Sequence, residues 1–579
     1  MVIAMRMIRV RYLVLFLSIL VLLSGTALGA AVQNSFGMVN VTEVDFSAAD
    51  GSNIHSTLQT PVYASGSNRL PGVVVIHGSL QSKEWLMAFG IELARRGFVV
   101  LTIDANGHGN SDRGTGSGAA ALDYIASLDY VDSTQIGIVG HSMGGGIARL
   151  AINESSVVVN AFVVVGSGIS WANTTYPHNV LVAVGDFDSL SSYPRNLTLL
   201  EGVFGVTDIE PGVVYGSFDE GTAREIVIAR TNHLFETIDP TIVSETVDWM
   251  RNSLKGGVED EHWLPKGNLV YGWWLVGGFF STLGAVLSVF PLLTILIGLK
   301  PFSVLKRGEQ EPYVNTASRK EYLVRGAVYG VIGVAGFYPF LAIGTLLQAV
   351  IPFPQVQGLS IIMWILGTAL ISRLVLPRIL SRQEDPGAVW RELRRIGPGA
   401  GGFARGFLRT LLLGGLVIVW LYGWTLLVDL GFALDLRAFL PGMNDLTVSR
   451  ALMFPLYAIV FFLYALVEGM WLMGALRTRA RTPWTRGMIV WAIEAVFIKC
   501  IPFVLLISIE LGGGLLLGVP LIPGIIGYSF LFFYAFVPWF GVASIVTVWC
   551  YRETGTFYLG AIINGLLFGW MIATILAFT

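Results

Sequence analysis

The feature that most constrains this chain is a change in composition near Pro265. Of its 579 residues, 54% are apolar and only 13% are charged, which lies outside the range of soluble globular proteins. Acidic and polar residues crowd the stretch before Pro265, whereas Leu, Gly, Phe and Trp dominate after it. The sequence therefore predicts a polar N-terminal part and a lipid-embedded part, with a domain boundary near residue 265.

The apolar part contains several stretches long enough to cross a hydrocarbon core of roughly 30 Å. Since each would form a helix in lipid, we expect an all-α bundle of about eight transmembrane helices after the boundary. The predicted spans are 269–298, 323–350, 358–376, 407–432, 451–476, 488–511, 522–549 and 556–577.

The basic residues between these spans are distributed unevenly. The loops at 300–325, 373–409, 477–486 and 550–556 hold 19 Lys and Arg residues, whereas the opposite loops hold two, Arg437 and Arg450. Since cytoplasmic loops are rich in Lys and Arg, this bias places residues 32–265 outside the cytoplasm. The stretch Gly512–Pro523 is either a connection or a re-entrant loop.

The first 31 residues have the layout of an export signal. Arg6, Arg9 and Arg11 precede an apolar run at 12–23 and a small-residue stretch at 25–30, which is typical of a cleaved signal peptide or a retained signal anchor. We therefore expect a signal segment at 1–31, an extracytoplasmic domain at 32–265 and a polytopic domain at 266–579 in the plasma membrane.

Strand-like and helix-like segments alternate in the polar part. Strands are predicted at 72–76, 98–103, 135–139, 157–165, 180–184 and 225–229, and helices at 84–96, 119–130, 142–153 and 240–254. This alternation predicts an α/β fold with a doubly wound, mostly parallel sheet. Reactive groups in such sheets lie in loops at the carboxyl ends of the strands.

Gly140-His141-Ser142-Met143-Gly144 marks a candidate nucleophile. The Gly-x-Ser-x-Gly pattern alone is weak, but here it follows a predicted strand and opens a helix rich in small residues, as a nucleophile elbow requires. The two glycines allow close approach of strand and helix, so a strained serine can point out of the sheet.

Three motifs in order give residues 45–255 a specific resemblance to the α/β-hydrolase family: His77-Gly78-Ser79, the run 104–111 (Asp-Ala-Asn-Gly-His-Gly-Asn-Ser), and the Ser142 elbow. The resemblance implies a Ser-Asp/Glu-His triad in that chain order. It also implies an oxyanion hole made by the backbone amides of Ser79 and Met143. His77 and His108 are interpreted as organising their turns, because a general base must reach the nucleophile.

The acid and the base should follow later strands. In the family the acid stands three residues after the glycine that ends its strand, which favours Asp188 and leaves Asp186 as the alternative. The remaining histidines are His233, which follows the strand at 225–229, and His262, which lies in a charged linker. His233 is therefore the predicted base.

The site lacks the lid that many family members carry, since only about a dozen residues separate the strands at 157–165 and 180–184. Two candidates could cover it, the insertion at 193–223 and the outer surface of the membrane part. We expect the membrane part to help form the substrate site, because the linker after the last helix is short.

Ionisable residues inside the predicted spans include Glu468, Glu494, Lys499 and Glu510. Charge in lipid is costly and marks either function or a paired contact. Glu494 and Lys499 are five residues apart and do not share a helix face, so a partner on another helix, such as Glu468, is expected for Lys499.

These observations predict a membrane-bound serine hydrolase, of the esterase or lipase kind, that cleaves acyl esters through Ser142, Asp188 and His233. The alternatives are a serine peptidase, or a transporter or assembly protein with a non-catalytic hydrolase-like module. The expected partner is an acyl substrate, which includes the case of a lipid. No nucleic-acid partner is expected, since the net charge is −2. A metal-dependent protease inside the membrane is not expected either, since no predicted span contains a histidine. No cofactor or metal is therefore predicted.

Overall fold

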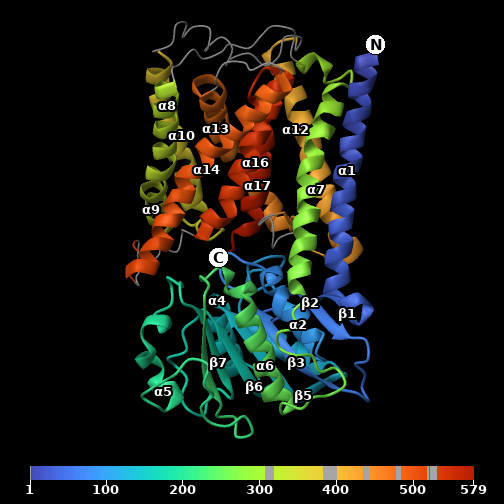
Figure 1. Cartoon of the computed structure of the whole chain (residues 1–579), viewed down its shortest axis with the longest axis vertical. Helices are drawn as coiled ribbons and strands as arrows, with labels where there is room; N and C mark the ends of the chain where they lie inside the picture. The colour runs from blue at the N-terminus through green and yellow to red at the C-terminus, as the bar shows by residue number, and fades with distance from the viewer. Residues whose placement is uncertain are drawn as a thin grey trace.

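The computed structural model describes residues 2–306, 319–381, 401–434, 443–476, 484–517, 521 and 531–578. A mixed α/β region lies against one end of a bundle of long helices, and the C-terminus lies where the two regions meet (Figure 1). Three of the predicted basic loops, Arg437 and the stretch Gly512–Pro523 fall wholly or partly outside the described residues. The charge bias across the bundle therefore stays a prediction.

An eight-stranded sheet forms the centre of the α/β region, in the order β1-β2-β4-β3-β5-β6-β7-β8. β1 and β2 pair antiparallel with their neighbours, and the strands from β4 to β8 run parallel. The mostly parallel sheet is confirmed, but the sequence analysis missed the antiparallel edge pair, β1 and β2. The strands are β1 Val39–Ser47, β2 Asn53–Pro61, β3 Leu70–Ile76, β4 Val99–Ile103, β5 Val131–His141, β6 Val159–Val165, β7 Val180–Gly185 and β8 Arg224–Ala229.

Helices cover both faces of this sheet, because both faces are apolar. Val73 and Val75 of β3 join a buried cluster with Met250 of α6, while Val74 joins a separate cluster with Ala148 of α4. This division follows from the period of two along a strand. The helices are α2 Met87–Ala94, α3 Ser117–Ser127, α4 Met143–Glu154 and α6 Pro240–Lys255, with the short α5 Glu201–Phe204 in the insertion.

Among the described residues, eight helical segments are long and apolar enough to cross a membrane. One is part of α1 and seven follow Pro265, whereas the predicted span 522–549 corresponds in its described part to α16, which is outside this set. The helices of the bundle are α1 Val2–Gln33, α7 Tyr271–Ile297, α8 Arg319–Ala335, α9 Phe337–Gln348, α10 Gly358–Leu380, α12 Phe403–Phe432, α13 Val448–Met470, α14 Trp484–Leu517, α16 Leu531–Thr554 and α17 Tyr558–Ile575.

Helix α1 is part of this bundle, since it packs along α7 (Figure 1). A side chain at Gly25 would overlap the backbone of α7, and one at Gly277 would overlap the backbone of α1. The Thr26 and Ser281 hydroxyls lie 2.8 Å apart across this contact. Small residues thus allow the close backbone approach that stabilises helix pairs in lipid.

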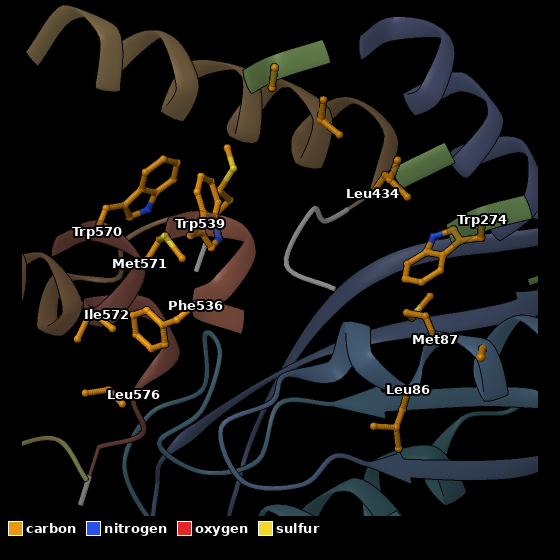
Figure 2. Packing of buried hydrophobic residues seen from close by; sticks show 14 of the residues in the cluster. Leu86, Met87, Trp274, Leu434, Phe536, Trp539, Trp570, Met571, Ile572 and Leu576 are labelled. Atoms are coloured by element: carbon orange, nitrogen blue, oxygen red, sulfur yellow. The ribbon is translucent and has the colours of Figure 1, made fainter. Parts of the chain in front are cut away.

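The two regions share one apolar core. Figure 2 shows Leu86 and Met87 of the α/β region near Trp274 of α7, and all three belong to one buried cluster. The first turn of α7 is capped by buried Glu92, whose Oε1 accepts hydrogen bonds from the amides of Val270 (2.6 Å) and Tyr271 (2.9 Å). A carboxylate at a helix N-terminus accepts hydrogen bonds from the free amides and interacts favourably with the positive end of the helix dipole. These bonds attach the start of α7 to α2 of the α/β region.

Arg450 at the start of α13 forms a second connection. Its buried guanidinium donates to the carbonyls of Gly107 (3.3 Å) and Gly109 (2.9 Å) in the loop after β4. It also donates to Ala573, Thr574 and Leu576 at the end of α17, at 2.8 to 3.0 Å. One side chain thus ties a strand-end loop to the last helix.

Inside the bundle, Lys499 of α14 pairs with Glu468 of α13, with Nζ 2.9 Å from Oε1. This confirms the predicted partner on another helix. Tyr329 of α8 donates to the same Oε1 at 2.9 Å, and Tyr464 contacts the Lys499 ammonium. The buried charges therefore satisfy each other, as charge in lipid requires.

Candidate active site

Ser142 lies in the sharp turn between β5 and α4, with φ 52° and ψ −117°. A β-carbon added at Gly140 would overlap the backbone of Gly144, and one added at Gly144 would overlap the backbone at the end of β3. Only glycine fits both positions, so the strand and helix cross closely and hold Ser142 in this strained conformation. The turn has the geometry of a nucleophile elbow.

The structure brings His233 and Asp188 to Ser142. His233 Nε2 lies 2.9 Å from Ser142 Oγ, and His233 Nδ1 lies 3.0 Å from Asp188 Oδ2. Asp188 is fully buried, and its Oδ1 accepts hydrogen bonds from the amides of Leu190 (2.7 Å) and Ser191 (3.2 Å). Burial opposes its ionisation, but His233 and these amides outweigh burial, so the pKa of Asp188 is lowered.

The two alternative residues lie outside this arrangement. Among the described residues, Asp186 Oδ1 has no hydrogen-bond partner, and burial raises the pKa of Asp186. His262 stacks on Tyr63 with ring centroids 3.8 Å apart, and its amide donates to Asp260. Neither residue contacts Ser142 or His233 in the described part of the chain.

Ser79 and Met143 border the nucleophile from two sides. Met143 follows Ser142 at the N-terminus of α4, and a β-carbon at Gly78 would lie 3.0 Å from Ser142 Cβ. Within the described residues, neither the Ser79 amide nor the Met143 amide donates to a protein acceptor. Gly78, the residue before Ser79, therefore lies against Ser142, and the two amides have no protein acceptor among the described residues, which is one requirement of an oxyanion hole.

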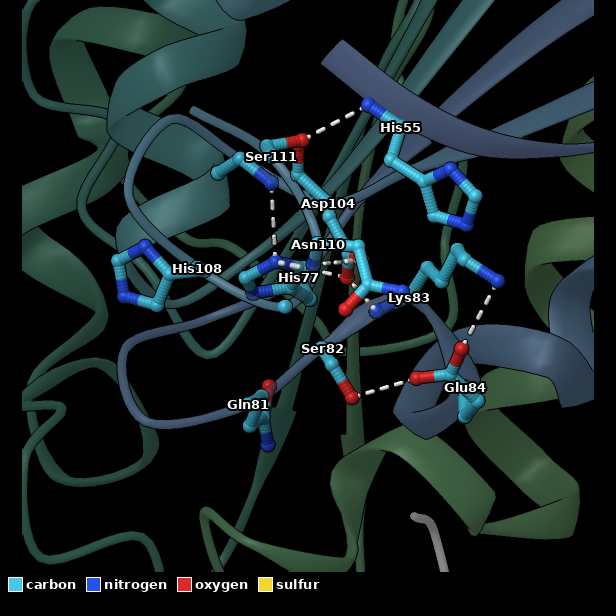
Figure 3. Close-up of polar contacts among 12 residues, drawn as sticks. His55, His77, Gln81, Ser82, Lys83, Glu84, Asp104, His108, Asn110 and Ser111 are labelled. Atoms are coloured by element: carbon cyan, nitrogen blue, oxygen red, sulfur yellow. Dashed lines mark hydrogen bonds and ion pairs between the residues drawn. The ribbon is translucent and has the colours of Figure 1, made fainter. Parts of the chain in front are cut away.

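His77, His108 and Asp104 organise the loops beside the site (Figure 3). His77 Nε2 accepts a hydrogen bond from the Ala105 amide at 3.0 Å, and Asp104 accepts from the amides of Lys83 (2.8 Å) and Asn110 (2.9 Å). His108 donates to the Asn106 carbonyl, and burial lowers its pKa to about 3. The contacts of the two histidines agree with the turn-organising role expected from the sequence.

Two further residues of the site were missed by the sequence analysis, His141 and Glu236. Glu236 Oε2 lies 3.4 Å from His233 Nδ1 and 3.4 Å from His141 Nε2. His141 donates to the His233 carbonyl at 3.0 Å. Glu236 stands three residues after His233, but nothing in that spacing alone distinguishes it from an exposed helix residue.

His141, His233 and Glu236 also present atoms within 4.8 Å of one another, a spacing that a metal ion could use. The nitrogens concerned already contact other partners. His233 Nδ1 bonds Asp188, and His141 Nε2 bonds the His233 carbonyl. The donor set therefore fits a hydrogen-bonded network better than a ligand set.

The bundle contacts the strand-end loops around this site. Phe235, two residues after His233, packs edge to face on Tyr534 of α16, with ring centroids 5.7 Å apart. Asn110 donates to Asp445 and accepts from Asn444, both at 2.9 Å. In contrast, the insertion packs Leu200, Val203 and Phe204 into the core on the α3 and α4 face.

Comparisons with known proteins indicate the class of the N-terminal region. Residues 70–192 match the family described as serine aminopeptidase, S33. The chain is 35% identical over 107 residues to lipase 1 of Moraxella sp. and 33% identical over 121 residues to bis(hydroxyethyl) terephthalate hydrolase of Streptomyces coelicolor. These matches cover 18% and 20% of this chain and 34% and 39% of the two relatives. The chain thus spans little more than a third of their length.

Similar solved structures include an esterase of Pyrococcus furiosus, at 13% identity and a TM-score of 0.29. The similarity covers 38% of this chain and 96% of that one. The sheet order and the family match show that the N-terminal region has the α/β-hydrolase fold. The relatives support a hydrolase of the esterase and lipase kind.

Proposed function

We propose that this protein is a membrane-bound serine hydrolase that cleaves acyl esters at the outer membrane surface. The observation that carries the proposal is the continuous contact from Ser142 Oγ through His233 to Asp188, at 2.9 and 3.0 Å. An isolated serine hydroxyl is a poor nucleophile near neutral pH, and an imidazole in this position activates it.

The reaction begins when Ser142 Oγ attacks the ester carbonyl and transfers its proton to His233 Nε2. Asp188 accepts the Nδ1–H of His233, which fixes the ring orientation and stabilises the imidazolium. The amides of Ser79 and Met143 bind the oxyanion, and one such donor contributes about 2.7–4 kcal/mol in a measured enzyme. His233 then protonates the leaving alcohol, and water attacks the acyl-enzyme through the same base.

The bundle takes the place of the missing lid. Its contacts with Phe235, Asn110 and the loop carrying Gly107 lie beside the proposed site. We infer that the acyl group binds between these loops and the outer end of the bundle, where a lipid ester is within reach. Helix α1 acts as a retained anchor, because its packing on α7 would be lost by cleavage.

A serine peptidase is the second candidate, because the matching family is described as serine aminopeptidase. The triad geometry does not separate an ester from an amide. The relatives named lipase and terephthalate ester hydrolase favour the ester. A non-catalytic module is disfavoured, because such a module has no need of an activated serine.

A fluorophosphonate probe tests the proposal on the full-length protein. We expect wild type to be labelled and Ser142→Ala and His233→Ala to remain unlabelled, while His262→Ala is labelled like wild type. Equal labelling of wild type and Ser142→Ala would contradict the assignment. A panel of p-nitrophenyl esters and aminoacyl amides then separates the esterase from the peptidase.

A further inference from the structure

Glu236 is a fully buried carboxyl that the catalytic sequence above does not use. It lies in the turn Phe235–Ile238 that follows His233, and its Oε1 accepts a hydrogen bond from the Gly185 amide at 2.7 Å. A β-carbon at Gly166, after β6, would overlap Oε2. The carboxyl is therefore held in one position by the ends of two strands.

The other oxygen, Oε2, has no hydrogen-bond donor among the described residues. Two imidazole nitrogens lie near Oε2, but each bonds another partner: His233 Nδ1 bonds Asp188 at 3.0 Å, and His141 Nε2 bonds the His233 carbonyl at 3.0 Å. Both nitrogens lie farther from Glu236 Oε2, at 3.4 Å. An ionised carboxylate can only accept, so a buried oxygen without a donor is costly, whereas a protonated carboxyl carries its own donor.

Asp188 and Glu236 are two buried carboxyl groups near the same imidazole, and ionisation of one disfavours ionisation of the other. Two neighbouring buried carboxyls do not both ionise readily, and the one with more donors keeps the charge. Asp188 has the amides of Leu190 and Ser191 as well as His233. Burial and the nearby Asp188 raise the pKa of Glu236 well above its usual value. The titratable groups facing Glu236 are His233 and Asp239 from its own segment, His141 from β5 and Asp188 from the loop after β7.

We propose that Glu236 is a positioning residue that remains protonated and donates its O–H to the Asp188 carboxylate, holding Asp188 against His233. This inference rests on the proposed function, because it assigns Asp188 the acid's role. Asp188 is then the single negative charge that faces His233, and Glu236 supplies orientation without adding charge.

The matched pair Glu236→Gln and Glu236→Leu tests this role in the full-length protein. The glutamine amide is uncharged, accepts from Gly185 and donates to Asp188, so it imitates the protonated acid. We expect Glu236→Gln to retain kcat/KM within about threefold of wild type and to leave the acid limb of its pH profile in place. We expect Glu236→Leu, which has neither donor nor acceptor, to lose at least about tenfold in kcat/KM.

Two outcomes overturn the inference. A shift of the acid limb to lower pH by about one unit in Glu236→Gln would mean that a negative charge had been removed beside His233. Wild-type kcat/KM in a folded Glu236→Leu would show that the side chain orients nothing. The thermal unfolding midpoint of each variant establishes folding.

A measurement that needs no turnover separates this inference from the proposed function. The infrared difference spectrum between Ser142→Ala and the double variant Ser142→Ala/Glu236→Gln at pH 7 should show the carbonyl band of a protonated carboxylic acid. A carboxylate band in its place would overturn the inference even if Ser142 is the nucleophile. If the acid band is present while no substrate is hydrolysed by wild type, the protonation stands and the proposed function fails.

Discussion

The α/β region and the helical bundle both bury ionisable side chains, but they hold them by different means. In the α/β region, Asp104 and Asp188 each accept two backbone amides from loops at strand ends. In the bundle, Glu468 and Lys499 contact each other and tyrosine side chains, and the Lys499 ammonium also lies 4.6 Å from the centroid of the Phe540 ring. The reason is geometric, because the amides inside a helix are already bonded to carbonyls four residues earlier.

This difference indicates where each kind of function can be built. A strand-end loop offers free amides that can hold a carboxylate or bind an oxyanion, so the chemistry belongs to the α/β region. A helix leaves free backbone amides only in its first turn, and Arg450 uses the other end of a helix, where it bonds the last carbonyls of α17. We therefore expect the bundle to support the site from its outer end.

Replacing Ser142, the proposed nucleophile, is the strongest test of this division. We expect Ser142→Ala to lower kcat/KM for an ester by a factor on the order of 10⁴–10⁶, because all covalent chemistry is lost. The measurement is ester hydrolysis by full-length protein in nanodiscs. His262→Ala is the matched control and should keep wild-type activity. Ester hydrolysis at the wild-type rate by Ser142→Ala would show that the reaction does not depend on this strand-end serine.

The two aspartates after β7 give the next largest contrast. Asp188→Asn should lower kcat by roughly 10⁴, since the amide favours the wrong tautomer of His233. Asp186→Asn should change kcat by less than about threefold, because Asp186 does not contact His233 in the structure. Steady-state kinetics of both variants checks the pair. A larger loss of kcat in Asp186→Asn than in Asp188→Asn would show that Asp186, and not Asp188, is the acid.

Arg450 tests whether the bundle supports the site. Arg450→Ala removes the donor from the buried Gly109 carbonyl and one of two donors from the Gly107 carbonyl, which keeps the Phe578 amide, and we expect a loss of about 2–4 kcal/mol in the free energy of unfolding. Activity should fall as well, because this loop borders the site. Arg378→Ala, at an exposed arginine of α10, is the control and should change stability by less than about 0.5 kcal/mol.

The two regions also differ in how far their sequences predict them. In the α/β region, a short local motif predicted the Ser142 elbow, and the family resemblance carried by three such motifs implied Asp188 and His233 at the ends of later strands. The edge strands β1 and β2 and the role of Glu236 were missed. Glu236 reaches the site only because the turn after His233 folds back onto Gly185, and no local pattern encodes that contact.

In the bundle, hydropathy predicted the spans and the cost of buried charge predicted the partner of Lys499. The arrangement of the helices did not follow from the sequence, because apolar faces in lipid do not specify their neighbours. The docking of α1 on α7 depends on which glycines face each other. Periodicity alone gives no means of pairing Gly25 with Gly277.

The smallest expected effect concerns the pH dependence of stability in the loop beside the bundle. Burial lowers the pKa of His108 from 6.5 to about 3, so the folded chain keeps it neutral where the unfolded chain takes up a proton. The unfolded state therefore binds more protons between these values, and the free energy of unfolding should fall as pH decreases from 6.5 towards 3. One such histidine contributes a loss of about 1.4 kcal/mol one unit below pH 6.5.

Thermal unfolding of wild type and His108→Gln at pH 7.5 and 5.5 measures this difference, and the variant should lose less stability on acidification. Equal losses in both proteins would show that His108 is hydrated in solution, and the loop would then not be sealed against the bundle.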